Sequence, residues 1–196
     1  MAKPELLRTF IALPLADDVI GQLDQVQRTL RRTCPEQAVT WVKPASIHLT
    51  LFFLGEILLE MTTPVQAALH VVARNTASFT FTVQGAGAFP NLNRPRVIWV
   101  GLSDPGGRLT MLHRTVNEAM ETVGFKPEMR PFSPHLTLGR VKPHATREDA
   151  QAIGQVVGKI EVGVLGQVRA AEIIFFRSIL KPTGAEYTPL KTFPLT

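Results

Sequence analysis

A six-residue segment occurs twice in this chain of 196 residues. Ser46-Ile47-His48-Leu49-Thr50-Leu51 returns as Ser133-Pro134-His135-Leu136-Thr137-Leu138, with five of the six positions identical. The two histidines are 87 residues apart (135 − 48). Two His-x-Thr tripeptides that share a serine and both leucines are not expected by chance in a chain with five histidines. The repeat therefore predicts one site that is built from two halves of the chain.

The alternation within each segment is typical of a β-strand. Successive side chains of a strand point to opposite faces, so His48 and Thr50 share one face while Leu49 and Leu51 share the other. The leucines are expected to be buried and the polar pair to face a groove. Two such strands across a cleft would bring together two imidazoles, which act as base or acid because their unperturbed pKa is about 6.5. The alternative is that the histidines are structural and the threonines ordinary strand residues.

The duplication extends beyond the hexamer, because each half reads strand, helix, histidine strand, helix, strand. Predicted strands start 40 residues before the first histidine (Arg8 to His48) and 39 residues before the second (Arg96 to His135). This pattern predicts an α+β fold with two lobes related by a pseudo-twofold axis, each an antiparallel sheet with helices on its outer face. The lobes would share a central cleft to which each contributes one His-x-Thr-x motif. We expect a single bilobal domain over residues 1–196, with approximate halves 1–90 and 91–196.

Local signals place the remaining elements. Asp17 or Asp18 is expected to cap a first helix with Val19, Leu23, Val26 and Leu30 on its buried face, and Thr63-Pro64 to start a second. Thr146 and Asp149 have the spacing of a capping box. The glycine- and proline-rich stretch from Gly85 to Pro95 is expected to be the loop that joins the lobes. Two final strands are expected at Ile160–Val168 and Glu172–Leu180.

Composition restricts the class of protein. Hydrophobic residues make up 45% and charged residues 19%, as in soluble globular proteins. The single cysteine, Cys34, excludes an internal disulfide, and no Cys/His cluster has zinc-site spacing. The apolar stretch from Phe10 to Leu15 is too short for a signal peptide or a membrane span, so we expect a cytoplasmic protein. A net charge of +5 and a pI of about 9.8 favour polyanions such as nucleic acid, with a generic basic surface as the equal alternative.

The motifs resemble those of the 2H phosphoesterases, and in particular RNA 2',3'-cyclic phosphodiesterases, also known as bacterial 2'-5' RNA ligases. Nearly the whole chain takes part in the resemblance. It rests on Arg8-x-Phe10-x-Ala12, His48 to Gly55, Arg96 to Gly101, Pro131 to Arg140, and Tyr187-Thr188-Pro189-Leu190.

The resemblance implies a hydrolysis of terminal 2',3'-cyclic phosphate to a 2'-phosphate without metal or other cofactor. His48 would be the proton donor to the leaving 3'-oxygen, and His135 would be the proton acceptor that activates water. Thr50 and Thr137 would donate hydrogen bonds to the non-bridging phosphate oxygens. The residues themselves do not say which imidazole carries the proton at rest.

Two further residues follow from the resemblance. Arg140, five residues after His135, is the family-matched cation for the phosphate, and its guanidinium suits two oxygens at once. Phe53 occupies the corresponding place after His48, so the charge is supplied from one side only. Phe10 is a candidate to stack on the terminal base, with a core position as the equal alternative.

The expected partner is RNA with 2',3'-cyclic phosphate ends. We expect the protein to be a monomer and not to bind a membrane. The reverse reaction, a 2'-5' ligation, would use the same transition state. The alternatives are a phosphodiesterase of 2'-5'-linked or small cyclic nucleotides, and a non-catalytic module that binds RNA ends. A metal site made by His48 and His135 is the weakest alternative, because two neutral ligands without a carboxylate hold a divalent ion poorly.

Overall fold

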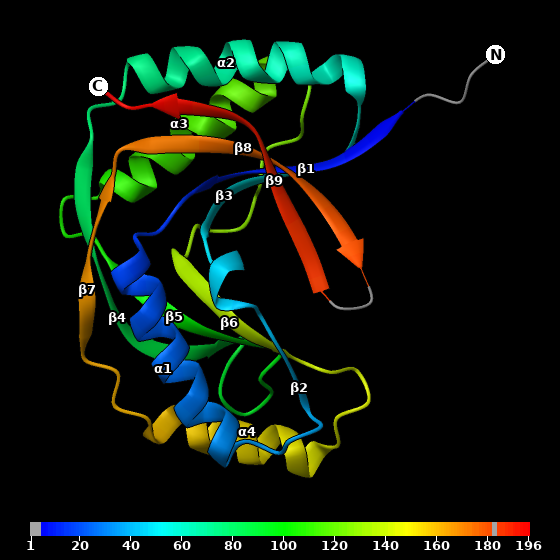
Figure 1. Cartoon of the computed structure of the whole chain (residues 1–196), viewed down its shortest axis with the longest axis vertical. Helices are drawn as coiled ribbons and strands as arrows, with labels where there is room; N and C mark the ends of the chain where they lie inside the picture. Colours follow the sequence, from blue (N-terminus) through cyan, green and yellow to red (C-terminus); the bar gives the residue numbers. More distant parts are fainter. Residues whose placement is uncertain (1–4, 182–183) are drawn as a thin grey trace.

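The computed structural model describes residues 5–181 and 184–196, which form two antiparallel sheets and four α-helices (Figure 1). Sheet A has the strand order β3-β1-β8-β9, and sheet B has the order β2-β6-β5-β4-β7. The elements are β1 (Leu6–Leu13), α1 (Asp17–Thr33), β2 (Val39–Trp41), β3 (Leu49–Leu58), α2 (Thr62–Arg74), β4 (Phe79–Phe89), β5 (Val97–Ser103), α3 (Arg108–Thr122), β6 (His135–Val141), α4 (Arg147–Lys159), β7 (Val164–Ala170), β8 (Glu172–Lys181) and β9 (Gly184–Pro194). The predicted α+β fold is confirmed.

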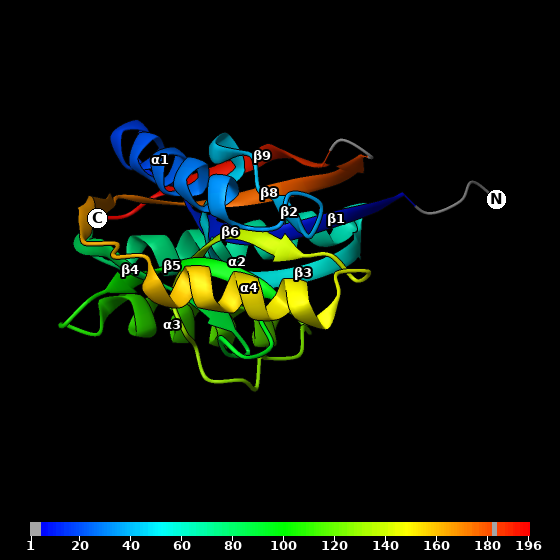
Figure 2. The same ribbon diagram turned by 90° about the horizontal axis from the view of Figure 1, so that it is seen from below.

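The helices divide between the two sheets. Helices α2 and α3 contact strands of sheet A, whereas α1 and α4 contact strands of sheet B. Figure 2 shows α1 and α3 on opposite sides of the molecule, with the strands between them. No helix in the described part of the chain has both the length and the apolarity needed to cross a membrane.

The sheets do not coincide with the two halves of the sequence. Strand β4 belongs to the first half but lies in sheet B, and β8 and β9 return from the second half to sheet A. The helices follow the same exchange, because α1 packs on sheet B and α3 on sheet A. Each lobe is therefore assembled from both halves, and the lobes are interlocked by the chain.

The first part of the expected joint between the lobes, residues 85–89, is strand, and residues 90–95 form a loop. β4 continues to Phe89, through a bulge where Gly85 has a φ of 71° and the register shifts between Gln84 and Ala86. Gly87 leaves the room that the Trp99 ring occupies on the neighbouring strand. Gly85 thus allows the bulge, and Gly87 allows close packing of Trp99. The short connection after Phe89 links β4 to β5 within sheet B.

The predicted helix starts need small corrections. Helix α1 has Ala16 at its N-cap, and Asp17 and Asp18 lie in the first turn, where carboxylates interact favourably with the helix dipole. Helix α2 begins at Thr62, so Thr63-Pro64 also lies inside the first turn. The capping box is confirmed, with Thr146 N donating to Asp149 Oδ2 at 2.9 Å and Asp149 N donating to Thr146 Oγ1 at 3.1 Å.

The C-terminal strands differ most from the prediction. β7 spans Val164–Ala170, four residues after the expected start, and β9 was not predicted at all. β9 contains Pro189, which lacks the N–H that an inner strand needs. It is tolerated because β9 is the edge strand of sheet A.

Candidate active site

The two motifs have the same pattern of burial. In each, the histidine and threonine are half-buried and the two leucines are buried, with exposures of 1% and 2% for Leu49 and Leu51 and 0% for both Leu136 and Leu138. His48 immediately precedes β3, and His135 is the first residue of β6. The leucines anchor both strands in the core and leave the polar pair on the opposite face.

A β-bulge in β6 decides where Arg140 points. β5 pairs Trp99 with Thr137 and Val97 with Arg140, so Leu138 stands as an extra residue between the two pairs. Since Trp99 and Val97 are two residues apart, Thr137 and Arg140 lie on the same face of the sheet. Without the bulge, the three-residue spacing from Thr137 would turn Arg140 to the other face.

Strand β3 carries a bulge at the equivalent place. β1 pairs Ala12 with Thr50 and Phe10 with Phe53, and Leu51 is the extra residue. Thr50 and Phe53 therefore share a face, as Thr137 and Arg140 do. The two strands therefore have the same local geometry but carry different side chains after the bulge, Arg140 on β6 and Phe53 on β3.

A buried glutamine supports the bulge in β6. The carbonyl of Leu138 accepts hydrogen bonds from Val42 N at 2.9 Å and from Gln27 Nε2 at 2.7 Å, and Gln27 Nε2 also donates to Val42 O at 2.8 Å. Gln27 is fully buried on α1, and Val26 beside it, which was expected on the buried face, is half-buried against the core. The position of Gln27, four residues after Leu23 and three before Leu30, is the signal that could have placed it there.

Both imidazoles are held in the same tautomer. The Nδ1 atom of His48 lies 2.9 Å from the carbonyl oxygen of Ser46, and that of His135 lies 2.7 Å from the carbonyl oxygen of Ser133. Because a carbonyl oxygen only accepts, Nδ1 must carry the hydrogen in each ring. Nε2 is then the nitrogen that carries a lone pair in the neutral ring and is left for chemistry.

His48 lies in an aromatic environment. Its ring stacks on Phe10 at 4.7 Å between centroids and meets the edge of Tyr187 at 5.1 Å. Burial lowers the pKa of His48 to about 4, although the hydrogen bond to Ser46 favours the protonated ring. The ring is therefore neutral at pH 7 in the absence of a ligand.

His135 differs from His48 because a cation acts on it. Burial is the main cause of its lowered pKa, and its ring meets Phe89 edge-on at 4.9 Å. The hydrogen bond to Ser133 opposes this shift, and the charge of Arg140 lowers the pKa further. Arg140 thus disfavours a protonated His135 and helps to keep this ring neutral, which is the form that can accept a proton.

Tyr187 connects the two motifs. It lies on β9 of sheet A and contacts His48, and the charges of Arg140 from sheet B and Arg8 from β1 act on its hydroxyl. Burial raises the pKa of Tyr187, and the two arginines oppose that rise. Neither Tyr187 nor Arg8 is among the site residues that were predicted from the sequence. The alternation of Arg8 with Phe10 and the single tyrosine of the chain were the available signals.

The structure contradicts the expected stacking role of Phe10. Its side chain is only 3% exposed, and its ring lies against His48 at 4.7 Å and Phe176 at 5.1 Å, both nearly parallel. A base cannot reach either face, so Phe10 supports His48 instead. Phe53, whose ring centroid is 6.1 Å from that of Phe10, is 67% exposed on the face of Thr50.

The donor set suits an anion. Two imidazoles, two threonine hydroxyls, a phenol and a guanidinium supply hydrogen-bond donors and positive charge, which phosphate oxygens require. Within residues 5–181 and 184–196, no three His, Cys, Asp or Glu side chains gather in a way that could hold a metal ion.

Comparison with known proteins agrees with this architecture. The model of the family described as LigT-like phosphoesterase matches the chain twice, over residues 13–99 and 100–187. The chain therefore belongs to the LigT-like phosphoesterases, within the 2H phosphoesterase family that its motifs resemble.

Individual relatives cover the chain almost completely. The RNA 2',3'-cyclic phosphodiesterase of Methanothermobacter thermautotrophicus is 30% identical over 189 residues, which are 96% of this chain and 99% of that protein. A crystal structure of a Thermus thermophilus protein has a TM-score of 0.79 at 29% identity, covering 96% of this chain and 97% of that one. Escherichia coli LigT in complex with 3'-AMP has a TM-score of 0.77 at 26% identity, covering 98% and 99%.

Proposed function

We propose that this protein hydrolyses the 2',3'-cyclic phosphate at the end of an RNA to a 2'-phosphomonoester. The observation that carries the proposal is the pair of half-buried imidazoles, each with Nε2 free, on the strands that also present Thr50, Thr137 and Arg140. The names of the curated relatives, RNA 2',3'-cyclic phosphodiesterases, support the same activity.

In this proposal the imidazoles divide the proton transfers as the family resemblance implies. His135, beside Arg140, accepts a proton from water through Nε2 while the water oxygen attacks phosphorus. The bond from phosphorus to the 3'-oxygen breaks, and His48 gives its Nε2 proton to that oxygen. An anionic phosphate close to His48 raises the pKa of this ring, so the bound substrate itself favours the protonated donor.

The other residues of the site act on charge and on the base. Thr50 and Thr137 donate to the non-bridging oxygens, and each such donor is worth about 3 kcal/mol in the transition state. Arg140 binds two phosphate oxygens. Phe53 takes the stacking role that Phe10 cannot fill, a contact worth about 1–3 kcal/mol.

The side chains named here supply the proton transfers and the charge stabilisation in this scheme, so the proposed reaction uses no metal or other cofactor. The same site would join RNA ends through a 2'-5' linkage if a 5'-hydroxyl attacked phosphorus in place of water while the 3'-oxygen leaves. Because a single chain supplies both motifs, we expect a monomer to be active, and we expect it to act in the cytoplasm.

The direct test is to incubate the protein in EDTA with a short RNA that ends in a 2',3'-cyclic phosphate and to identify the product. A 2'-phosphate is expected, and a 3'-phosphate would reverse the assigned leaving group. His48→Ala and His135→Ala should each abolish turnover while circular dichroism remains that of the wild type. Wild-type turnover in either variant would exclude the paired mechanism.

The alternative functions give different outcomes in the same assay. A phosphodiesterase of small nucleotides would turn over a cyclic mononucleotide or a 2'-5'-linked dinucleotide faster than the RNA end. A non-catalytic module would bind the RNA end without product, and binding would survive the loss of either histidine.

A further inference from the structure

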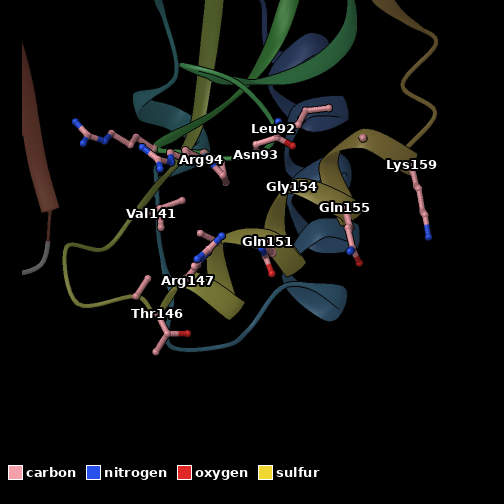
Figure 3. Close-up of a pocket in the computed structure, with 15 residues that line it drawn as sticks. Leu92, Asn93, Arg94, Val141, Thr146, Arg147, Gln151, Gly154, Gln155 and Lys159 are labelled. Carbon is pink, nitrogen blue, oxygen red and sulfur yellow. The ribbon is translucent and has the colours of Figure 1, made fainter.

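A basic groove lies apart from the two motifs, between α4 and the loop after β4 (Figure 3). It encloses about 1010 Å³. Its walls come from residues 92–96 and from α4, and Val141 at the end of β6 lies between them. In Figure 3, Arg147 points from α4 toward the loop that carries Arg94.

The charge of this groove is of one sign. Four exposed cations line it, namely Arg94, Arg96, Arg147 and Lys159, and no described lining residue is acidic. None of the four takes part in an ion pair within the described part of the chain. Gln151 and Gln155 add hydrogen-bonding groups along the helix. Such a lining fits a chain of phosphates and sugars.

The loop of residues 92–96 packs against α4 through a close backbone contact. A Cβ atom at Gly154 would collide with the carbonyl oxygen of Leu92, so only glycine lets the loop lie this near to α4. Gly154 is buried in the middle of α4, where glycine is otherwise unfavourable by about 1 kcal/mol. The groove is therefore a built feature of the fold and not a gap between mobile side chains.

The groove begins next to the candidate active site. Val141 N donates to Arg96 O at 3.0 Å, which ties two lining residues together at the end of sheet B. Val141 directly follows Arg140, and the two side chains point to opposite faces of the strand. A strand that reaches from Arg140 to the groove therefore has to pass around the ends of β5 and β6, from one face of sheet B to the other.

We propose that this groove binds the phosphates of the RNA nucleotides that precede the cyclic end. The inference rests on the proposed function, in which the 3'-terminal phosphate lies at Arg140 and the rest of the strand leaves in the 5' direction. The groove recognises the backbone of the strand and not its sequence, since arginine and lysine contacts to phosphate carry no base information. It makes the protein prefer an RNA end over a cyclic mononucleotide.

The test compares two substrates and two double variants. Arg94→Gln with Arg147→Gln removes two charges from the groove. Arg74→Gln with Arg114→Gln removes two exposed charges from α2 and α3, of which Arg114 pairs with Glu118, and is a control of equal change in net charge. The kcat/KM is measured on a cyclic mononucleotide and on a ten-nucleotide RNA with a cyclic end, at several salt concentrations.

The groove variant should lose about tenfold in kcat/KM on the RNA through KM, and nothing on the mononucleotide. Its salt dependence on the RNA should weaken by about 0.7 in log–log slope for each phosphate contact removed. Arg94→Lys with Arg147→Lys should restore most of the loss, because lysine also binds phosphate as a point charge. Equal behaviour of the groove variant and the control on the RNA would overturn the proposal.

Binding separates a failure of the groove from a failure of the proposed function. If the wild type hydrolyses neither substrate, the proposed activity is wrong. The affinity for the same RNA, measured by fluorescence anisotropy, then tests the groove independently of hydrolysis. Weaker binding by the groove variant than by the control would support the groove, and identical affinities would reject it.

Discussion

At the scale of single residues, the two histidines are alike in tautomer and differ in their electrostatic surroundings. A carbonyl oxygen holds Nδ1 of each ring, and burial lowers both pKa values, that of His48 to about 4. Arg140 acts on His135 and favours its neutral ring, the form that the proposed base needs. The repeat therefore makes two equivalent imidazoles, and one cation makes them unequal.

The lowered pKa values of the two histidines predict an acidic pH optimum. For the free enzyme, kcat/KM requires protonated His48 and neutral His135, and both pKa values lie below 6.5. The bell-shaped profile of kcat/KM should therefore peak below pH 6.5. The profile of kcat should peak at higher pH, because the bound phosphate raises the pKa of His48. Steady-state kinetics between pH 4 and 9 check both, and a kcat/KM that rises steadily to pH 9 would contradict the assignment.

Phe53 and Phe10 offer a matched pair of substitutions. Phe53→Ala should raise KM for an RNA end by about fivefold to 150-fold, since base stacking is worth about 1–3 kcal/mol, and should leave stability unchanged. Phe10→Ala should instead lower the free energy of unfolding by about 3–5 kcal/mol, because the ring is buried between His48 and Phe176. Urea denaturation and kinetics on both variants distinguish the roles. A strong loss of stability in Phe53→Ala would argue against the stacking role.

At the scale of elements, the bulge in β6 and the helix α1 act together. The extra residue Leu138 turns Arg140 to the face of Thr137, and Gln27 binds the Leu138 carbonyl from α1. The spacing of side chains along the strand thus depends on a hydrogen bond that spans 111 residues of sequence. The direction of Arg140 on β6 thus depends on a buried amide on α1.

Loss of this amide should affect both stability and binding. Gln27→Leu leaves the Val42 carbonyl without its partner and should lower the free energy of unfolding by about 1–3 kcal/mol. It should also raise KM, because the bulge that orients Arg140 loses support. Gln25→Leu, on the exposed side of the same helix, is the control and should change neither. Unaltered stability and KM in Gln27→Leu would show that the bulge holds by itself.

The contact between Gly154 of α4 and the Leu92 carbonyl can be tested by substitution. Gly154→Ala places a methyl group against the Leu92 carbonyl and should destabilise the protein by about 1–3 kcal/mol or displace the loop. Gly158→Ala meets only the end of the flexible Leu92 side chain at 3.2 Å and should be neutral or stabilising by up to about 1 kcal/mol. Thermal unfolding of the two variants measures the difference. Similar melting temperatures would show that the backbone contact is not required.

At the scale of the whole molecule, strands from each half of the chain pack against the motif of the other half. β8 and β9 come from the end of the chain and carry Phe176 and Tyr187 to the first motif, whereas β4 carries Phe89 to the second. Each histidine is therefore desolvated by a strand from the other half of the sequence. Neither half could complete its own motif.

This desolvation makes stability depend on pH. A histidine whose pKa is lowered in the folded state takes up a proton more readily when the chain unfolds, so its contribution is intact above pH 6.5 and is lost as the pH falls toward 4. For His48 the loss is up to about 3 kcal/mol. Urea unfolding at pH 7 and pH 4.5 should show a smaller difference for His48→Gln than for the wild type. An equal difference in both proteins would mean that His48 is not the group responsible.

The sequence by itself determined what depends on neighbours along the chain. The repeat identified His48 and His135, strand alternation separated the leucines from the polar residues, and the capping box set the start of α4. Side-chain alternation and capping follow from backbone geometry over a few residues, so a short window of sequence contains them.

Only the tertiary structure decided what depends on pairing between distant segments. The bulges that orient Arg140 and Phe53 exist because β6 and β3 pair with particular strands, and the burial of Phe10 depends on β8 lying beside β1. The strand β9 is compatible with Pro189 only at the edge of a sheet. Register, edge position and burial are properties of pairs of segments, and no single segment of the sequence carries them.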